Sequence, residues 1–191
     1  MKRLMDLVLS LLGLIIISPV MLVLAIIIKC TSKGPVLFKQ RRIGRFKKEF
    51  LIYKFRTMRV NAPKDVPTHM MTDAALFITP VGKFMRKTSL DELPQLFNII
   101  RGQMSIVGPR PALYNQHDLI SLRERYGINR LRPGLTGWAQ INGRDELPIP
   151  VKVKYDYYYL KNRSFWLDLK IIFRTFFKAI SGKGVVDGSE R

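Results

Sequence analysis

The longest apolar run of the chain lies at its beginning. Leu4 to Ile28 is apolar apart from Asp6, Ser10 and Ser18. A run of about 20 apolar residues is long enough to cross the hydrocarbon core of a bilayer. The pattern therefore predicts a helix that enters a membrane.

Two features of this run favour a helix that enters the membrane, bends and returns. Basic residues flank it on both sides, as Lys2 and Arg3 before it and as the cluster 29–48 after it. Because positively charged flanks stay in the cytoplasm, both ends are expected there. Ser18-Pro19 lies near the middle, where proline removes a helical hydrogen bond. We expect a re-entrant helix-break-helix with its break at Ser18 and Pro19; an ordinary single-pass anchor is the alternative.

After the apolar run, the pattern changes to short segments typical of strands. Residues 36–42 and 50–56 are extended segments joined by a turn, which predicts a β-hairpin. Side chains alternate between the two faces of a strand, so Lys54 and Arg56 share one face and Phe55 takes the other. The basic face is either a solvated surface beside anionic lipid or a phosphate site.

The rest of the chain alternates helical periods with segments rich in turn residues. Asn61 to Asp73 has no clear period and is predicted as a loop over a site, with His69 as a surface residue. Residues 132–144 are rich in glycine and are predicted as a loop built for close approach. Apolar spacing predicts helices at about 91–101, 119–126 and 165–180.

The last predicted helix is amphipathic. Its apolar face contains Leu169, Ile172, Phe173, Phe176 and Ile180, and its basic stripe contains Lys170, Arg174 and Lys178. A helix in the membrane interface and a helix packed on the core both fit this pattern.

These elements predict a single α+β domain over residues 1–191, a length typical of one domain. The re-entrant membrane helix occupies 1–30 and a cytoplasmic catalytic part occupies 31–191. That part holds a small β-hairpin, several short helices and amphipathic interfacial helices. The predicted fold class is therefore that of a monotopic membrane protein.

Charge narrows the choice of partner. The chain has 33 Lys plus Arg against 14 Asp plus Glu, a formal charge of +19. This excess indicates an anionic partner, which could be nucleic acid, an anionic membrane surface or a phosphorylated small molecule. A single cysteine, Cys30, excludes an intramolecular disulfide, and with His69 and His117 it offers too few ligands for a zinc site.

Two adjacent acids, Asp91 and Glu92, stand out in so basic a chain. Ser89-x-x-Glu92 matches a helix capping box, which would give Glu92 a structural role. Pro94 favours a later helix start, which places both carboxylates at a helix N-terminus, where negative charge is stabilised. An ionised Asp91 could then attack phosphorus or hold a divalent cation, and Glu92 could carry a proton. Capping and catalysis both remain open.

Arg110 follows shortly after, between Pro109 and Pro111. Because each proline fixes its own φ and restricts the residue before it, this turn is rigid. A guanidinium presented from it is suited to bidentate contact with a phosphate.

Taken together, these motifs resemble the bacterial sugar transferase family, the monotopic phosphoglycosyl transferases, over nearly the whole chain, in the form of a catalytic unit alone. They occur in one order, as Ser18-Pro19, Gly34-Pro35-Val36, Tyr53-Lys54-Phe55-Arg56-Thr57-Met58, Arg86-Lys87-Thr88-Ser89-Leu90-Asp91-Glu92-Leu93-Pro94-Gln95, Gly108-Pro109-Arg110-Pro111 and Pro133-Gly134-Leu135-Thr136-Gly137-Trp138.

The resemblance implies a reaction at the cytoplasmic face of a bacterial plasma membrane, in the first membrane step of glycan assembly. Sugar-1-phosphate would pass from a UDP-sugar to polyprenyl (undecaprenyl) phosphate, with release of UMP. Asp91 would be the nucleophile and would hold Mg²⁺, and Glu92 would be an assisting acid or base. Phosphate-binding residues would be Lys54, Arg56, Arg86 and Arg110.

By the same resemblance, the partners would be the two substrates and the cytoplasmic leaflet, without nucleic acid. The rival class is a membrane-anchored basic module that binds anionic lipid or nucleic acid; the sugar, the pathway and the oligomeric state stay open. Three departures from the family pattern occur, at Gln103, at Leu76-Phe77 and at Lys47-Lys48-Glu49.

Overall fold

The computed structural model describes residues 1–63, 66, 71, 74–143 and 147–181. His69 and most of the predicted loop around it lie outside the described residues. The described helices are α1 (Lys2–Thr31), α2 (Ala74–Phe77), α3 (Pro80–Thr88), α4 (Gln95–Ile100), α5 (His117–Arg125), α6 (Trp138–Ile141), α7 (Ile149–Asn162) and α8 (Phe165–Ser181).

Two small sheets accompany these helices. β1 (Leu37–Ile43) and β2 (Glu49–Phe55) form the predicted antiparallel hairpin, with Phe38 opposite Lys54. β3 (Ser105–Val107) and β4 (Gly134–Thr136) form a parallel pair. β4 and α6 both lie within the segment 132–144 that was predicted as a loop. The fold is thus mixed helix and sheet, as the α+β prediction required.

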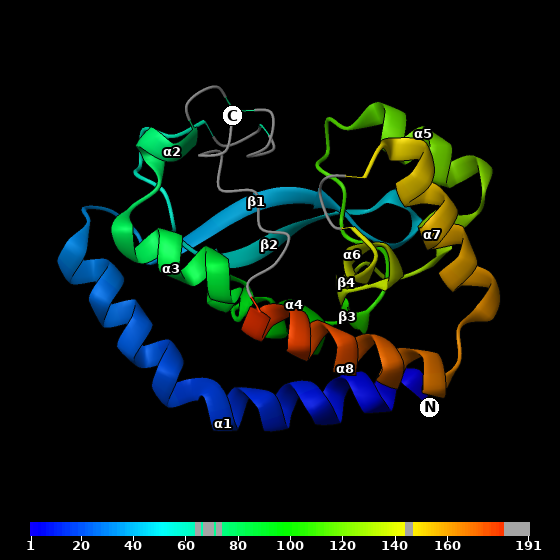
Figure 1. Ribbon diagram of the computed structural model, residues 1–191, viewed down its shortest axis with the longest axis horizontal. Helices are drawn as coiled ribbons and strands as arrows, with labels where there is room; N and C mark the ends of the chain where they lie inside the picture. Colours follow the sequence, from blue (N-terminus) through cyan, green and yellow to red (C-terminus); the bar gives the residue numbers. More distant parts are fainter. Residues whose placement is uncertain (64–65, 67–70, 72–73, 144–146, 182–191) are drawn as a thin grey trace.

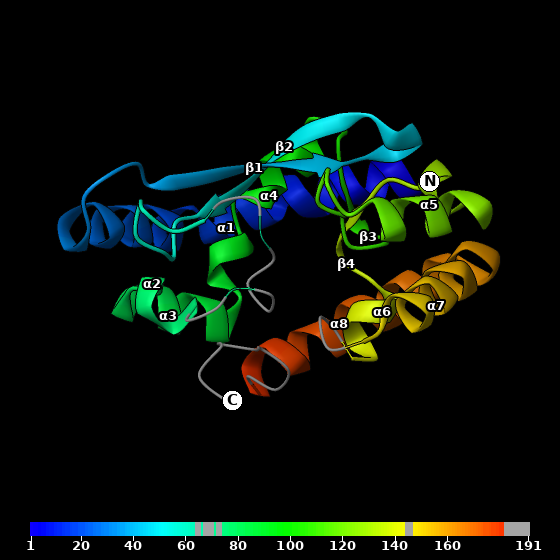
Figure 2. The same ribbon diagram turned by 90° about the horizontal axis from the view of Figure 1, so that it is seen from above.

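Figure 1 shows the β1–β2 hairpin across the middle of the molecule, with α2 and α3 at one end and α5 and α7 at the other. α1 runs along the lower edge of this view, and α8 lies just above it. Figure 2 shows from a second side that α1 and α8 run apart over most of their lengths, and the ion pair Lys2–Asp168 joins them at 2.7 Å near the start of each helix.

α1 is continuous where a break was expected. It is helical from Lys2 to Thr31 with Pro19 inside it, and Figure 1 shows that it bends part-way along its length. Proline cannot donate to the carbonyl four residues earlier, which is that of Ile15. The Ser18 hydroxyl donates to this Ile15 carbonyl at 2.9 Å. The side chain thus compensates for the missing hydrogen bond, and the chain bends without leaving the helix.

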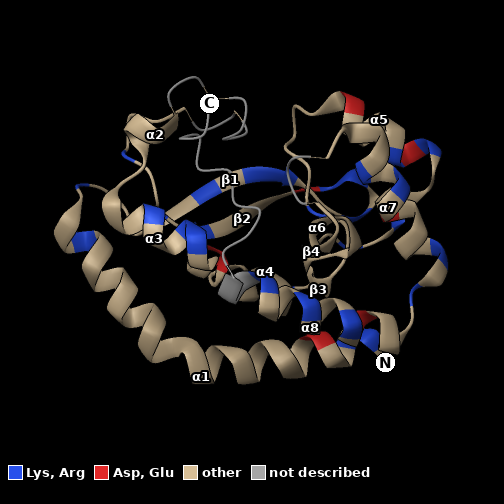
Figure 3. Ribbon diagram, viewed as in Figure 1, with Lys and Arg blue, Asp and Glu red and all other residues tan. Residues whose placement is uncertain are grey.

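The same helix is long and apolar enough to cross a membrane. Most of its large apolar side chains are exposed, and Figure 3 shows that its middle part lacks charged residues. Its buried positions pack on the rest of the chain: Leu24 and Ile28 contact a cluster with Phe55 and Met85. These contacts fit the predicted opposite orientation of Phe55 and Lys54 on β2.

The core-packing prediction for the C-terminal helix describes one side of α8, and the membrane-interface alternative stays a prediction for the other side. One side packs on the core through Ile171, which is fully buried, together with the half-buried Ile172. The aromatic side chains Phe173, Phe176 and Phe177 are exposed. An exposed aromatic row beside basic residues is typical of a helix in a membrane interface.

Candidate active site

The acidic pair lies in a sharp connection between two helices. Ser89 ends α3 in the left-handed conformation, with φ 59°, and residues 90–92 form a single 3-10 turn before α4 begins at Gln95. The two carboxylates therefore precede α4. The prediction that they occupy the first turn of this helix was wrong. Ser89 makes no side-chain cap on the turn, which removes the capping-box interpretation of Glu92.

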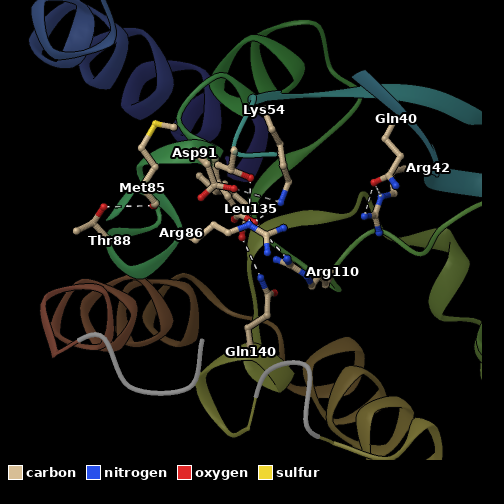
Figure 4. A network of polar contacts seen from close by, with 12 residues as sticks. Gln40, Arg42, Lys54, Met85, Arg86, Thr88, Asp91, Arg110, Leu135 and Gln140 are labelled. Carbon is tan, nitrogen blue, oxygen red and sulfur yellow. Dashed lines mark hydrogen bonds and ion pairs between the residues drawn. The ribbon is translucent and has the colours of Figure 1, made fainter. Parts of the chain in front are cut away.

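Two basic side chains converge on one oxygen of Glu92. Lys54 Nζ lies 2.7 Å from Glu92 Oε1, and Arg110 Nη2 donates to the same oxygen at 3.2 Å. Lys54 Nζ also lies 3.9 Å from Asp91 Oδ2. Figure 4 shows Lys54, Asp91, Arg86 and Arg110 turned toward one another. The hairpin, the 3-10 turn and the Pro-Arg-Pro turn thus meet at one point.

The two acids differ in their electrostatics. Burial raises the pKa of Asp91 above its ordinary value of 3.8, and the negative charge of Glu92 adds to the rise, while Lys54 opposes it. Burial also pushes the pKa of Glu92 upward, but Lys54 and Arg110 outweigh it and hold that pKa below 4.5. Glu92 is therefore more strongly stabilised as an anion than Asp91. The sequence had suggested the opposite, with an ionised Asp91 and a Glu92 that could carry a proton.

The other two predicted phosphate-binding residues are placed differently from each other. Arg86 Nε donates to Thr57 Oγ1 at 3.0 Å, and the Arg86 charge lowers the pKa of Asp91. The Arg56 guanidinium is only 6% exposed and donates to the carbonyls of Ser32 and Lys33 at the end of α1. Arg86 thus acts on the acidic pair, whereas Arg56 ties β2 to the membrane helix.

A cavity of about 940 Å³ opens beside the acids. Asp91, Glu92 and all four predicted basic residues line it. Its polar part reaches Gln40 and Arg42 on β1, which Figure 4 shows hydrogen-bonded to each other, and its apolar part reaches Ile17 on α1 and Phe176 on α8. One space therefore joins the charged site to the two helices with exposed apolar faces.

The side chains near Asp91 and Glu92 can be compared with the ligands that the predicted Mg²⁺ would need. Within the described part of the chain, no group of three or more His, Cys, Asp or Glu side chains could hold a metal. Mg²⁺ is commonly held by one or two carboxylates together with substrate phosphates and water. Asp91, whose carboxylate lies in the cavity wall and is less engaged by cations than Glu92, fits such a substrate-completed site.

The departures from the family pattern lie away from the acids. The Gln103 side chain accepts a hydrogen bond from Asn98 Nδ2 at 2.8 Å, a contact that an acid could equally make. Leu76 is exposed on α2, and Lys47 lies in the hairpin turn, where it and Phe46 have positive φ. None of these side chains contacts Asp91 or Glu92 among the described interactions.

Comparison of the sequence with models of known families identifies the family of this chain. The model of the family described as "Bacterial sugar transferase" matches residues 1–182. The chain belongs to the bacterial sugar transferase family.

Curated relatives are similar over nearly all of this sugar transferase chain. It is 47% identical over 189 residues to a UDP-glucose:undecaprenyl-phosphate glucose-1-phosphate transferase of Klebsiella pneumoniae, covering 95% of this chain and 40% of that protein. A UDP-N-acetylgalactosamine-undecaprenyl-phosphate N-acetylgalactosaminephosphotransferase of Aeromonas hydrophila is 39% identical, over 96% of this chain and 44% of its own. The chain thus spans less than half the length of these relatives.

Another relative matches over most of its own length. The uncharacterized sugar transferase EpsL of Bacillus subtilis is 38% identical over 185 residues, which cover 97% of this chain and 90% of that protein.

Proposed function

We propose that this sugar transferase moves a sugar-1-phosphate from a UDP-sugar to undecaprenyl phosphate and releases UMP. The Klebsiella pneumoniae and Aeromonas hydrophila relatives are named as enzymes that act on a UDP-sugar and undecaprenyl phosphate. The observation that carries the proposal to this chain is the buried Asp91 beside the half-buried Glu92, which Lys54 and Arg110 contact in the wall of a cavity with polar and apolar parts.

In the first half-reaction, a carboxylate oxygen of Asp91 attacks the β-phosphorus of the UDP-sugar. The new bond joins Asp91 to phosphorus, and the bond to the oxygen bridging both phosphates breaks, so that UMP leaves with that oxygen. In the second half-reaction, a phosphate oxygen of the lipid attacks the same phosphorus and frees the Asp91 carboxylate. The product is polyprenyl-diphosphate-sugar.

The neighbouring side chains prepare this attack electrostatically. Glu92 stays anionic and orients Lys54 and Arg110, whose positive charges stabilise negative charge that moves between the phosphates. Lys54 and Arg86 favour the ionised, nucleophilic form of Asp91 against the effect of burial. Mg²⁺, when held by Asp91 with the substrate phosphates, supplies further neutralisation of the diphosphate.

Contacts at both ends of α1 support the re-entrant topology. Lys2 pairs with Asp168 of α8 at 2.7 Å, and Arg3 donates to the carbonyl groups of Ile99 and Ile100 at the end of α4. At the other end, Arg56, which directly follows β2, donates to the carbonyl of Ser32. A helix that spans a bilayer separates its ends by the full hydrocarbon thickness, about 30 Å. Because one body binds both ends, we place both on the cytoplasmic side and the bend of α1 in the membrane.

The test is UMP release by Asp91→Asn. We expect Asp91→Asn to abolish UMP release from a UDP-sugar in the presence of Mg²⁺ and undecaprenyl phosphate, because the amide cannot replace the carboxylate nucleophile. Assays with UDP-glucose and with UDP-N-acetylgalactosamine would also identify the preferred sugar.

Asp118→Asn, which changes an exposed acid on α5, is the matched control and should keep wild-type turnover. Unchanged turnover in Asp91→Asn would refute the assigned nucleophile. If the wild-type chain turns over no UDP-sugar yet binds anionic vesicles, a lipid-binding module becomes the better interpretation.

A further inference from the structure

The backbone of the Pro-Arg-Pro turn is held from outside by a second arginine. Arg123 of α5 donates from Nη1 to the carbonyl oxygen of Arg110 at 2.8 Å. Pro109 and Pro111 on either side of this residue have no N–H group to donate, so their carbonyls take part instead: Pro109 accepts from the Gly134 amide and Pro111 from Arg42, each at 2.9 Å. The hydrogen bond from Arg123 therefore helps to fix the backbone of Arg110, from which its side chain extends.

Arg123 is itself oriented by a buried carboxylate. Its Nε and Nη2 both donate to Asp156 Oδ2 of α7, at 3.0 and 2.6 Å. Arg123 is 5% exposed and Asp156 is 2% exposed, so the pair is almost fully removed from water. Asp156 thus occupies the edge of the guanidinium formed by Nε and Nη2, and Nη1 is left to donate to the Arg110 carbonyl.

Burying such a pair has an electrostatic cost. The desolvation of two charges can equal or exceed their mutual attraction, so apolar side chains of similar volume would often stabilise a fold as well. Apolar side chains would not, however, donate a directed hydrogen bond to the Arg110 carbonyl. The Arg123–Asp156 pair therefore orients the backbone of Arg110. The side chain of Arg110 carries the guanidinium that donates to Glu92 at 3.2 Å.

We infer that Arg123 and Asp156 are positioning residues for the acidic site, which act through the backbone of Arg110. The connection runs from Asp156 on α7 to Arg123 on α5, to the carbonyl of Arg110, and through its side chain to Glu92. This inference rests on the proposed function for the role of Arg110 in turnover, but the placement of Arg110 is a separate structural statement.

A double-mutant cycle tests the inference on activity. Arg123→Lys keeps a positive charge but cannot reach both Asp156 and the Arg110 carbonyl with the same geometry. We expect a loss of about ten- to hundred-fold in kcat for UMP release, because small displacements of a catalytic group have effects of that order. In the Arg110→Ala background, Arg123→Lys should cause no further loss, since the group that it positions is gone. A loss of the same factor in both backgrounds would overturn the inference.

A second readout does not depend on turnover. With ¹⁵N-labelled arginine in the full chain, the Nε–Hε resonance of Arg110 is assigned as the one that disappears in Arg110→Lys. Arg123→Lys and Asp156→Asn should shift or broaden this resonance. If both variants leave it unchanged, Arg110 is not positioned by the pair, whatever the fate of the proposed nucleophile.

Two controls separate positioning from general destabilisation. Val153→Ala removes a buried side chain one turn from Asp156 on α7 without breaking a hydrogen bond. Glu124→Gln removes a charge from α5 at an exposed ion pair with Lys47. Both should leave the Arg110 resonance and kcat near wild type. A kcat lowered equally by Val153→Ala and Arg123→Lys would reduce the pair to a structural role and overturn the inference.

Discussion

At the scale of single residues, Lys54 does the most to set the charge states of the acids. It contacts Glu92 at 2.7 Å and lies near Asp91, and its side chain is only 16% exposed. Exposed ion pairs contribute about 0–1 kcal/mol, whereas breaking a buried pair often costs about 3–5 kcal/mol. Loss of Lys54 should therefore change the chemistry of the site and not only its surface charge.

The charge of Lys54 should appear in the pH dependence of turnover. In the proposed mechanism Asp91 attacks in its ionised form; burial raises its pKa, and Lys54 lowers it. Lys54→Met therefore raises this pKa further, and the acid limb of the kcat/KM profile should move to higher pH. Lys83→Met, at an exposed position of α3, serves as the control of equal charge change. An acid limb that stays in place or moves to lower pH contradicts the assignment.

A second residue-scale prediction concerns stability. Phe46 in the hairpin turn has φ 55° and ψ 32°, and its side chain is exposed. Left-handed backbone costs about 1–2 kcal/mol for most residues, and asparagine tolerates it better. We expect Phe46→Asn to raise the free energy of unfolding by about 1 kcal/mol, measured by denaturation in detergent. Phe84→Asn, at an exposed position of regular helix α3, should give no gain.

The residues of the site were only partly predictable from the sequence. Lys54, Arg110 and both acids were found because they lie in compact motifs. Arg123 lies in the helix predicted at 119–126 but was not a candidate site residue, because its partner Asp156 lies 33 positions away and no local pattern joins them. The lower pKa of Glu92 arises because Lys54 and Arg110 both contact its Oε1 atom. The spacing of these residues along the chain does not determine that contact.

At the scale of elements, the hairpin was predicted closely, whereas α3 and α7 were not predicted. α7 contains Val151, Val153 and Tyr155 alternating with lysines, a pattern that favours a strand by its period and propensity. Its buried residues are Val153, Asp156 and Tyr159, so the helix is set by tertiary packing. In α3, Gly82 weakens the helical pattern, yet a Cβ there would lie 2.0 Å from the Thr57 carbonyl oxygen.

The position of α1 gives a testable topology. If both of its ends lie on the cytoplasmic side, a cysteine added before Met1 and a second one at Lys33→Cys should both resist a membrane-impermeant thiol reagent applied from outside. The experiment uses a Cys30→Ser background, because Cys30 is exposed. Both cysteines should react after the membrane is opened. Labelling of either end in closed vesicles of outside-out orientation would show a spanning helix instead.

At the scale of the whole molecule, the two helices with exposed apolar side chains, α1 and α8, both run close to the lower edge of Figure 1. The exposed apolar side chains are mainly aliphatic on α1 and aromatic on α8. Lys and Arg side chains lie on α8 and on the elements above it, as Figure 3 shows. This arrangement suits a protein embedded in one leaflet, with apolar side chains in the acyl region and cations at the headgroups.

The tryptophans allow this orientation to be measured. Trp166 at the start of α8 is 76% exposed, whereas Trp138 is half-buried and stacks on Tyr158. In vesicles that contain lipids with brominated acyl chains, the fluorescence of Trp166 should be quenched strongly in a Trp138→Phe variant. The fluorescence of Trp138 in a Trp166→Phe variant should be quenched weakly. Equal quenching of both would contradict the proposed membrane-facing edge.

The contact of Asp6 has a consequence for how the protein is made. This carboxylate of α1 is 1% exposed and accepts hydrogen bonds from the Ser105 hydroxyl and from the Ile106 amide, which follow it by 99 and 100 positions. At about 5–20 residues per second, a ribosome needs roughly 5–20 s to reach those partners. α1 is therefore synthesised before the two hydrogen-bond donors of Asp6 exist. The contacts of Asp6 in the folded chain form only after residues 91 and 92 have also been synthesised.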